Sequence, residues 1–263
     1  MKKKSVYITG GTSGIGWELA KIYLKLGHTV GICGRSEKKI QAIREQESQI
    51  PNFKQLVLQR YDISIREQCR ENIQFFIQKC GLDLFIANAG VAFSDKKNIP
   101  NFEKSKQILD INVNGFLYSV EPAIEHFIQQ QSGHLVGVSS IAAHVCMPGV
   151  SAYASSKAFV LHLMKCYQQD LRDHNINTTV VCPGYVRTEL TSKNKHAMPQ
   201  ILSAEQAAHK IAGAISRKKI VYTFPFALGF VAKLIGALPP RILYFLLQGF
   251  PFKFSRKVKK PRP

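Results

Sequence analysis

The sequence is poor in acidic residues. Only 17 of its 263 residues are Asp or Glu, against 36 Lys and Arg, so the formal net charge is +19 at pH 7. Such a charge attracts nucleic acid, anionic lipid or phosphorylated ligands, but it does not distinguish among them. No basic recognition helix or RNA-stacking motif accompanies the charge, so we expect no specific nucleic-acid partner.

Cysteine pairs and metal-ligand clusters are also missing. The six cysteines include no C-x-x-C pair, and none has a histidine at metal-ligand spacing. A zinc site and a redox dithiol both need such spacings. We therefore expect no metal and a set of reduced, structural thiols.

Long apolar runs are absent before residue 220. The start, Met1 to Lys4, resembles the charged end of a signal peptide, but the apolar run behind it breaks at Thr9 and Gly10. A membrane span needs roughly 18 uninterrupted apolar residues, and no stretch before residue 220 has them. These features predict a cytoplasmic protein without a cleavable signal.

What the sequence does contain is an alternation of short β-branched runs with longer helical patterns. The expected strands are residues 6–9, 30–33, 56–59, 82–87, 134–139 and 178–182, and the expected helices are 18–26, 38–46, 65–79, 105–130 and 153–172. Repeated βα units predict an α/β fold, a doubly wound, Rossmann-like parallel sheet with helices on both faces. We assign residues 1–219 to this catalytic domain and 220–263 to a hydrophobic helical segment with a polybasic tail.

The appended segment is apolar and then basic. Between residues 220 and 252 the only charges are Lys233 and Arg241, and Pro239-Pro240 divides the stretch into two pieces too short to span a bilayer. Six basic residues follow without an acid. Apolar helices and a basic tail are the two signals of peripheral membrane contact. A substrate lid or a subunit contact remains an equal alternative.

A glycine-rich turn follows the first expected strand. Residues 10–16 read Gly-Gly-Thr-Ser-Gly-Ile-Gly and lead into a helix. A strand, a glycine turn and a helix start present backbone N–H groups to a pyrophosphate. The glycine spacing differs from that of the common G-x-G-x-x-G motif, but the same order of strand, glycine turn and helix can bind a phosphate. The predicted phosphate contacts are Gly10, Thr12, Ser13, Gly14, Ile15 and Gly16.

The end of the second strand distinguishes NAD from NADP. An acid there would bind the adenosine ribose hydroxyls, whereas a basic residue meets a 2′-phosphate. This chain has Arg35 at that point, with Lys38 and Lys39 close behind. We predict a preference for NADP(H); the alternative is that Arg35 is a solvated loop charge.

Tyr153 and Lys157 stand four residues apart on an expected helix, which places the phenol and the ammonium on one side. A tyrosine has an ordinary pKa of about 10, and a nearby cation favours its phenolate. The pair therefore predicts an acid/base group with a lowered pKa.

These motifs together resemble the short-chain dehydrogenase/reductase family over roughly residues 4–200. The resemblance rests on five features in order: Thr9 to Gly16, Asn88-Ala89-Gly90, Ser140 thirteen residues before Tyr153, the Tyr153/Lys157 pair, and Pro183-Gly184 with Thr188. It implies an NADP-dependent oxidoreductase that reduces a carbonyl to an alcohol. Membrane-associated relatives that act on keto lipids or steroids are similar in their tails, so we expect a lipophilic ketone or aldehyde.

The resemblance also implies roles for individual residues. Tyr153 would donate the proton, Ser140 would polarise the carbonyl oxygen, Lys157 would hold the nicotinamide ribose, and Asn112 would anchor a water of the proton relay. Ser139 competes with Ser140, and the family spacing to Tyr153 selects Ser140. Further implied coenzyme contacts are Asp62, Ile63, Asn88, Ala89, Gly90, Pro183, Gly184, Val186 and Thr188.

Three further expectations follow from the resemblance. Family members commonly form dimers or tetramers through the helices that correspond to residues 105–130 and 153–172. Gly137 stands where many members carry Asn, which predicts a change of packing rather than of chemistry. The alternative to an enzyme is a non-catalytic NADP(H)-binding sensor or scaffold protein, which the presence of Asn112, Ser140, Tyr153 and Lys157 disfavours.

Overall fold

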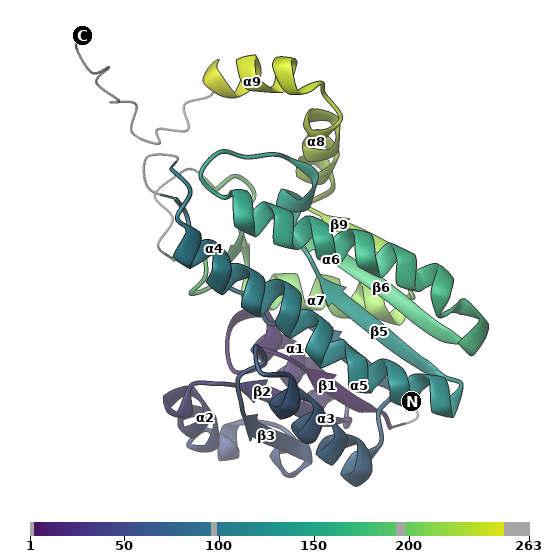
Figure 1. Ribbon diagram of the computed structural model, residues 1–263. Coiled ribbons are helices and arrows are strands. Elements are labelled where there is room, and N and C mark those ends of the chain that lie inside the picture. Colours follow the sequence, from purple (N-terminus) through teal and green to yellow (C-terminus); the bar gives the residue numbers. More distant parts are fainter. Residues whose placement is uncertain (1–2, 96–98, 193–197, 250–263) are drawn as a thin grey trace.

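The computed structural model describes residues 3–95, 99–192 and 198–249, and its centre is a parallel sheet of seven strands (Figure 1). In spatial order the strands are β3 (Leu56–Arg60), β2 (Thr29–Gly34), β1 (Ser5–Ile8), β4 (Leu84–Ala87), β5 (Gly133–Val138), β6 (Ile176–Pro183) and β9 (Val221–Phe224). Two short strands, β7 (Val186–Arg187) and β8 (Leu202–Ser203), pair outside this sheet. The predicted doubly wound fold is confirmed.

Helices cover both faces of the sheet. On one face α3 (Arg66–Cys80), α5 (Gly115–Gln130) and α6 (Ser151–Asp170) pack over a core that includes Phe76, Phe127 and Met164. On the other face lie α1 (Gly14–Lys25), α2 (Glu37–Arg44) and α7 (Ala204–Ser216), with Leu19 and Ile211 in a second core. Strands buried on both sides read as continuous apolar runs, as β1 and β4 do.

The strand order reverses between β1 and β4, because the chain first builds outward to β3 and then returns to the other side of β1. In parallel α/β sheets, ligands bind outside the carboxyl ends of the strands at such a reversal. Thr9, Asn88 and Ser139 directly follow β1, β4 and β5. The fold therefore brings the predicted motifs to one edge of the sheet.

The sequence reading missed the seventh strand. Residues 221–224 were assigned to the helical appendage, yet they form β9, which pairs with β6 in the register Val180↔Val221 to Pro183↔Phe224. The four residues of β9, three of them apolar or aromatic, merge with the apolar run that follows them, so no periodicity marks the strand.

One expected helix is divided. Residues 105–130 were predicted as a single helix, but the structure has α4 (Phe102–Leu109), a π-helical turn (Asp110–Asn114) and then α5. A π-helical turn widens the helix and shifts the side chains that follow it. This turn carries Asn112.

The two helices of the appendage are present as α8 (Phe226–Gly236) and α9 (Pro240–Gly249), which rise above the rest of the molecule (Figure 1). α8 packs on the 3₁₀ helix Ile141–His144: a Cβ added to Gly236 would overlap the carbonyl oxygen of His144. Within the described residues, no helix combines the length and the apolar character needed to cross a bilayer.

Candidate functional site

The glycine turn is closely packed. Gly14 begins α1 with a φ of +55°, a conformation that favours glycine, and a Cβ there would lie 3.1 Å from Cγ2 of Thr188. A Cβ on Gly16 would lie 2.4 Å from the carbonyl oxygen of Gly10. The side chain of Ser13, directly before α1, makes no capping hydrogen bond. The glycines therefore let the turn pack closely on its neighbours, and the N-terminus of α1 lacks a side-chain cap from Ser13, which fits a site for a phosphate group.

The end of β4 is tied to the end of β1. The backbone N–H groups of Asn88 and Ala89 each donate to Oγ1 of Thr9 at 3.1 Å, and the amide of Asn88 donates to the carbonyl oxygens of Thr9 and Gly10 at 3.0 and 3.2 Å. These bonds fix the segment Asn88 to Gly90 beside the glycine turn.

Arg35 lies at the end of β2, where it was expected, and has an acidic neighbour. Its Nη1 is 3.6 Å from Oδ2 of Asp62. Partial burial by itself raises the pKa of Asp62, but hydrogen bonds from Ser64 and the charge of Arg35 outweigh burial and lower it. The side chain of Ile63, which follows Asp62, is buried and packs against Gly115 of α5.

Lys39 and Glu189 form a contact that the sequence reading did not find. Nζ of Lys39 donates to Oγ of Ser13 at 3.2 Å and to Oε2 of Glu189 at 2.5 Å. Lys39 comes from the first turn of α2 and Glu189 follows Thr188, so the pair links the two sides of the glycine turn. The position of Lys39 shortly after Arg35 was a signal, whereas nothing in the sequence pointed to Glu189.

Asn112 joins the loop after β4 to α6. Its Oδ1 accepts from the N–H of Val91 at 2.8 Å, and its Nδ2 donates to the carbonyl oxygen of Val91 at 2.9 Å and to Oγ of Ser156 at 3.0 Å. The residue is buried, so these bonds hold it in one orientation.

Lys157 is a buried ammonium at the centre of the site. Its Nζ donates to the carbonyl oxygen of Val138, the last residue of β5, at 3.0 Å. Burial lowers the pKa of Lys157 to about 8. A Cβ added to Gly90 would lie 3.2 Å from both this Nζ and Oδ1 of Asn112. The absence of a side chain at Gly90 therefore allows its backbone to pack closely against Lys157 and Asn112.

The two adjacent serines differ in their partners. Oγ of Ser139 donates to the carbonyl oxygen of Lys157 at 2.7 Å and thereby ties β5 to α6. Oγ of Ser140 accepts from the N–H of Ala142 at 3.1 Å and lies close enough to the Tyr153 hydroxyl to lower its pKa. The structure therefore places Ser140, and not Ser139, beside Tyr153.

The pKa of Tyr153 differs from expectation. Burial raises it, and the group that counteracts burial is Ser140 rather than Lys157. Nζ of Lys157 lies 6.0 Å from the centre of the tyrosine ring and is directed to Val138. The expected lowering of the Tyr153 pKa by the lysine is not found: burial raises it, and the ammonium of Lys157 is directed to Val138 instead.

The segment after β6 closes the other side of the site. The N–H of Gly184, next to Pro183, donates to the carbonyl oxygen of Phe224 at 2.7 Å, and Val186 is buried. Thr188 then reaches the glycine turn at Gly14. At Gly137, the side chain of Met164 occupies the space of a larger residue, 2.7 Å from an added Cβ.

Comparison with known proteins identifies the family. The short chain dehydrogenase model matches residues 4–199. An uncharacterized oxidoreductase of Myxococcus xanthus is 31% identical over 241 residues, 91% of this chain and 94% of the relative. Dehydrogenase/reductase SDR family member 7B of Rattus norvegicus is 26% identical, covering 98% of this chain and 84% of the relative.

Among solved structures, ElxO with NADP bound has a TM-score of 0.76 and 25% identity, covering 84% of this chain and 97% of that one. The matched residues include the glycine turn, the buried Asn112 and Lys157, and the Ser140–Tyr153 pair. The chain therefore belongs to the short-chain dehydrogenase family.

Proposed function

We propose that this protein is an NADPH-dependent oxidoreductase that reduces a ketone or aldehyde to the alcohol. The observation that carries the proposal is the meeting of Ser140, Tyr153, Lys157 and Asn112 at the carboxyl edge of the sheet, beside the glycine turn. A sensor that only binds the coenzyme would not need a tyrosine and a serine hydroxyl paired next to a buried lysine.

The coenzyme would lie across the reversal of strand order, with its phosphates at Gly10 to Gly16 and its central part along Asn88 to Gly90. When bound, NADPH supplies the hydride that reduces the carbonyl carbon. Arg35 and Lys39 provide two cations near the end of β2, which supports a 2′-phosphate and hence NADP(H). ElxO, a relative of known structure, has NADP bound.

Tyr153 would donate its hydroxyl proton to the carbonyl oxygen. The raised pKa of Tyr153 keeps the phenol protonated at neutral pH, which suits a proton donor in the reducing direction. Oγ of Ser140 accepts from Ala142 and keeps its own proton, which Ser140 would donate to the same carbonyl oxygen. The two hydroxyls thus converge where negative charge develops on the oxygen.

Lys157 and Asn112 would support that step. One N–H of Lys157 is held by Val138, and its remaining N–H groups are available to the hydroxyls of the nicotinamide ribose. Both Nδ2 protons of Asn112 are used by Val91 and Ser156, so a relay water could meet only its remaining Oδ1 lone pair. We assign Asn112 chiefly as a positioning residue for Lys157 and the loop after β4.

A lipophilic substrate and peripheral membrane contact belong to the same proposal. α8 and α9 are largely apolar, and α8 packs on the 3₁₀ helix that follows Ser140, which supports an apolar approach to the site. A homodimer or homotetramer through α5 and α6 is also proposed. A surface hollow of about 460 Å³, which Tyr118 and Tyr167 help to line, lies between these helices and offers room for a partner's side chains.

The direct test follows NADPH oxidation with a panel of short and long-chain ketones and aldehydes, the long ones presented in detergent or vesicles. Tyr153→Phe removes only the proton donor and is expected to lower kcat by about 10²–10⁴-fold. Tyr167→Phe, on the same helix but away from the site, serves as the control. Retention of most of the rate by Tyr153→Phe would refute the mechanism.

Coenzyme preference is tested separately. Arg35→Asp exchanges the cation for a group that suits ribose hydroxyls, and the ratio of kcat/KM for NADPH to that for NADH is expected to fall roughly tenfold or more. Arg44→Asp, at the end of α2, controls for the change of net charge. An unchanged ratio in Arg35→Asp would assign the preference to other residues.

A further inference from the structure

The outward side of α8 carries an apolar stripe. Phe226, Phe230 and Leu234 follow one another at intervals of four residues and are 81%, 53% and 55% exposed. The rings of Phe226 and Phe230 stack, with their centres 6.2 Å apart. Side chains at this spacing share one side of a helix, while Gly229 and Ala232 are buried on the other. A surface helix normally presents polar residues outward, so α8 is apolar where water would favour charge.

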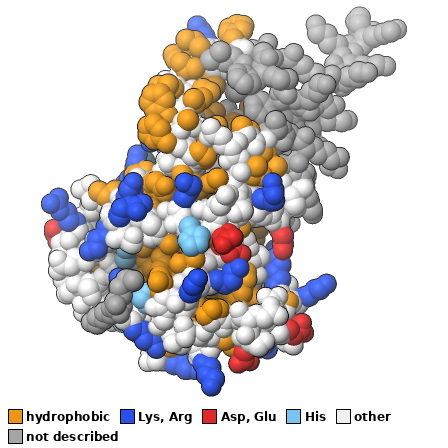
Figure 2. Space-filling view, turned by 180° about the vertical axis from the view of Figure 1, so that it is seen from behind, with side chains coloured by type: hydrophobic (Ala, Val, Ile, Leu, Met, Phe, Trp, Pro, Cys, Tyr) orange, Lys and Arg blue, Asp and Glu red, His pale blue; other side chains and the backbone are white. Residues whose placement is uncertain are grey.

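The stripe continues onto α9. Ile242 and Phe245 are also exposed, whereas Leu243 between them is buried. Hydrophobic side chains gather over this end of the molecule (Figure 2). We define Phe226, Phe230, Leu234, Ile242 and Phe245 as the α8–α9 face. Grouped apolar exposure of this kind marks an interaction surface.

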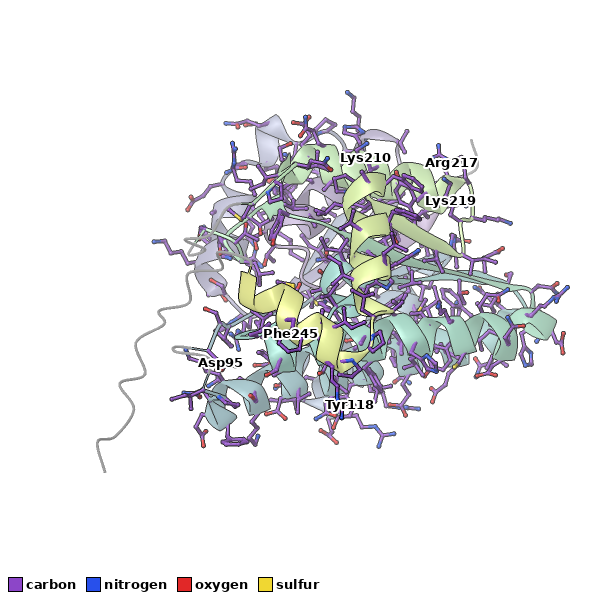
Figure 3. All side chains as sticks on the ribbon, turned by 90° about the horizontal axis from the view of Figure 1, so that it is seen from above. Asp95, Tyr118, Lys210, Arg217, Lys219 and Phe245 are labelled. Atoms are coloured by element: carbon purple, nitrogen blue, oxygen red, sulfur yellow. The ribbon has the colours of Figure 1, made fainter. Side chains whose placement is uncertain are left out.

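The C-terminal part of the sequence, from α7 through α9, carries almost only positive charge. After Glu205 the sequence has no acidic residue, but it has 12 Lys and Arg. In the described part of this region, Lys233 and Arg241 belong to α8 and α9, while Lys210, Arg217 and Lys219 lie together on one side of the molecule (Figure 3). We define these last three as the basic rim. The basic residues of this region therefore favour an anionic partner.

The sign of the charge decides between occupants. In a symmetric dimer the same patch meets itself, so Lys233 and Arg241 would face like charges across the interface. An anionic bilayer offers hydrocarbon to the aromatic side chains and phosphate to the basic ones. Helices of 11 and 10 residues are too short to span it but can lie along its surface.

We propose that the α8–α9 face docks on an anionic lipid bilayer, with the basic rim at the headgroups. Because α8 packs on the segment that directly follows Ser140, docking would place the lipid phase next to the entrance of the site. This inference deepens the proposed function by naming the surface through which a lipophilic carbonyl arrives, and that role rests on the proposed reaction. Docking itself requires no turnover.

The test measures sedimentation of the full-length protein with phosphatidylcholine vesicles, with and without phosphatidylglycerol, in the absence of coenzyme. The wild type is expected to bind the vesicles that contain phosphatidylglycerol. Phe226→Ser combined with Phe230→Ser is expected to weaken binding roughly tenfold or more. The control is Phe102→Ser with Phe75→Ser, because Phe102 and Phe75 are 82% and 52% exposed on α4 and α3 and match the altered pair in exposure.

The charge component has its own variant. Exchange of Lys210, Arg217 and Lys219 for Gln should weaken binding by up to about fivefold per charge at low salt, and the effect should shrink as salt is added. The control exchanges Lys25, Arg44 and Lys54, which are exposed on or beside α1, α2 and β3.

Three outcomes would overturn the proposal. The first is a wild type that binds neither kind of vesicle. The second is full binding by the serine pair, which would assign the contact to the basic tail alone. The third is that the variant with Phe226→Ser and Phe230→Ser changes the oligomeric state while the wild type does not bind lipid. That result would make the face a subunit contact. NADPH oxidation with a short, water-soluble aldehyde should be unchanged in the serine pair, so a failure of docking and a failure of the proposed reaction are separable.

Discussion

The carboxyl edge of the sheet buries polar groups, whereas the α8–α9 face exposes apolar ones. At the sheet edge, buried polar groups are held by backbone: Asn112 by Val91, Lys157 by Val138, and Ser139 by the carbonyl oxygen of Lys157. On the α8–α9 face, large apolar side chains such as Phe226 stand in water.

The difference shows which interactions stabilise each region. Buried polar groups that are fully bonded cost little and remain in one geometry, which suits a reaction that needs atoms in fixed places. Exposed apolar side chains contribute almost nothing until a partner covers them. We therefore expect variants of the sheet edge to change chemistry without changing lipid binding, and variants of the α8–α9 face to do the reverse.

Among the variants that separate the two regions by kinetics and vesicle binding, Lys157→Met has the largest expected effect. The variant removes the ammonium but retains an unbranched side chain in the buried space, and kcat/KM should fall by about 10²–10³-fold because a preorganised donor is lost. Binding to anionic vesicles should be unchanged. Steady-state kinetics and vesicle sedimentation measure the two, with Lys165→Met on the exposed side of α6 as the control. A loss of vesicle binding in Lys157→Met would break the separation between the regions.

A smaller effect follows from pH. Burial lowers the pKa of Lys157 to about 8 from its ordinary value of 10.5, so between these values the unfolded chain holds a proton that the folded protein has lost. The contribution of Lys157 to stability therefore rises with pH from about 8 to 10.5. Activity moves the other way, since loss of the ammonium above pH 8 should lower the rate by about tenfold per unit.

Rates and the free energy of unfolding across this pH range measure both trends, and Lys157→Met should remove both contributions. A rate that stays constant through pH 9 would show that Lys157 does not act as a cation.

The two regions also differ in what the sequence could predict. Tyr153 and Lys157 were predictable because a spacing of four residues on a helix fixes which side chains meet, and the glycines of the turn because only they permit its backbone. The partners of Asn112 were not, because the π-helical turn that orients it has no sequence signal. In the appendage, composition predicted apolar helices, but four residues of β9 were hidden in the same apolar run, and which side of α8 faces water depends on packing against His144.

The smallest effect is expected within the sheet edge itself, at the exposed contact between Lys39 and Glu189. Lys39 and Glu189 bridge the glycine turn at the surface, where ion pairs contribute little to stability. We expect Lys39 to bind a coenzyme phosphate and Glu189 to compete for the same ammonium. Glu189→Gln should therefore tighten NADPH binding about two- to fivefold, and Lys39→Gln should weaken it by a similar factor.

Fluorescence of Trp17, the single tryptophan, which lies in α1 next to the glycine turn, reports the dissociation constants. If Glu189 acts only through Lys39, the double variant binds NADPH as Lys39→Gln does, whereas independent effects would add. Lys38→Gln removes the same charge one residue away and should change little. Loss of affinity for NADPH but not NADH in Lys39→Gln would assign the ammonium to the 2′-phosphate, and equal losses would assign it to the pyrophosphate. Unchanged affinity for both coenzymes would make the bridge a structural contact, leaving the rigid, buried part of the edge to bind the coenzyme alone.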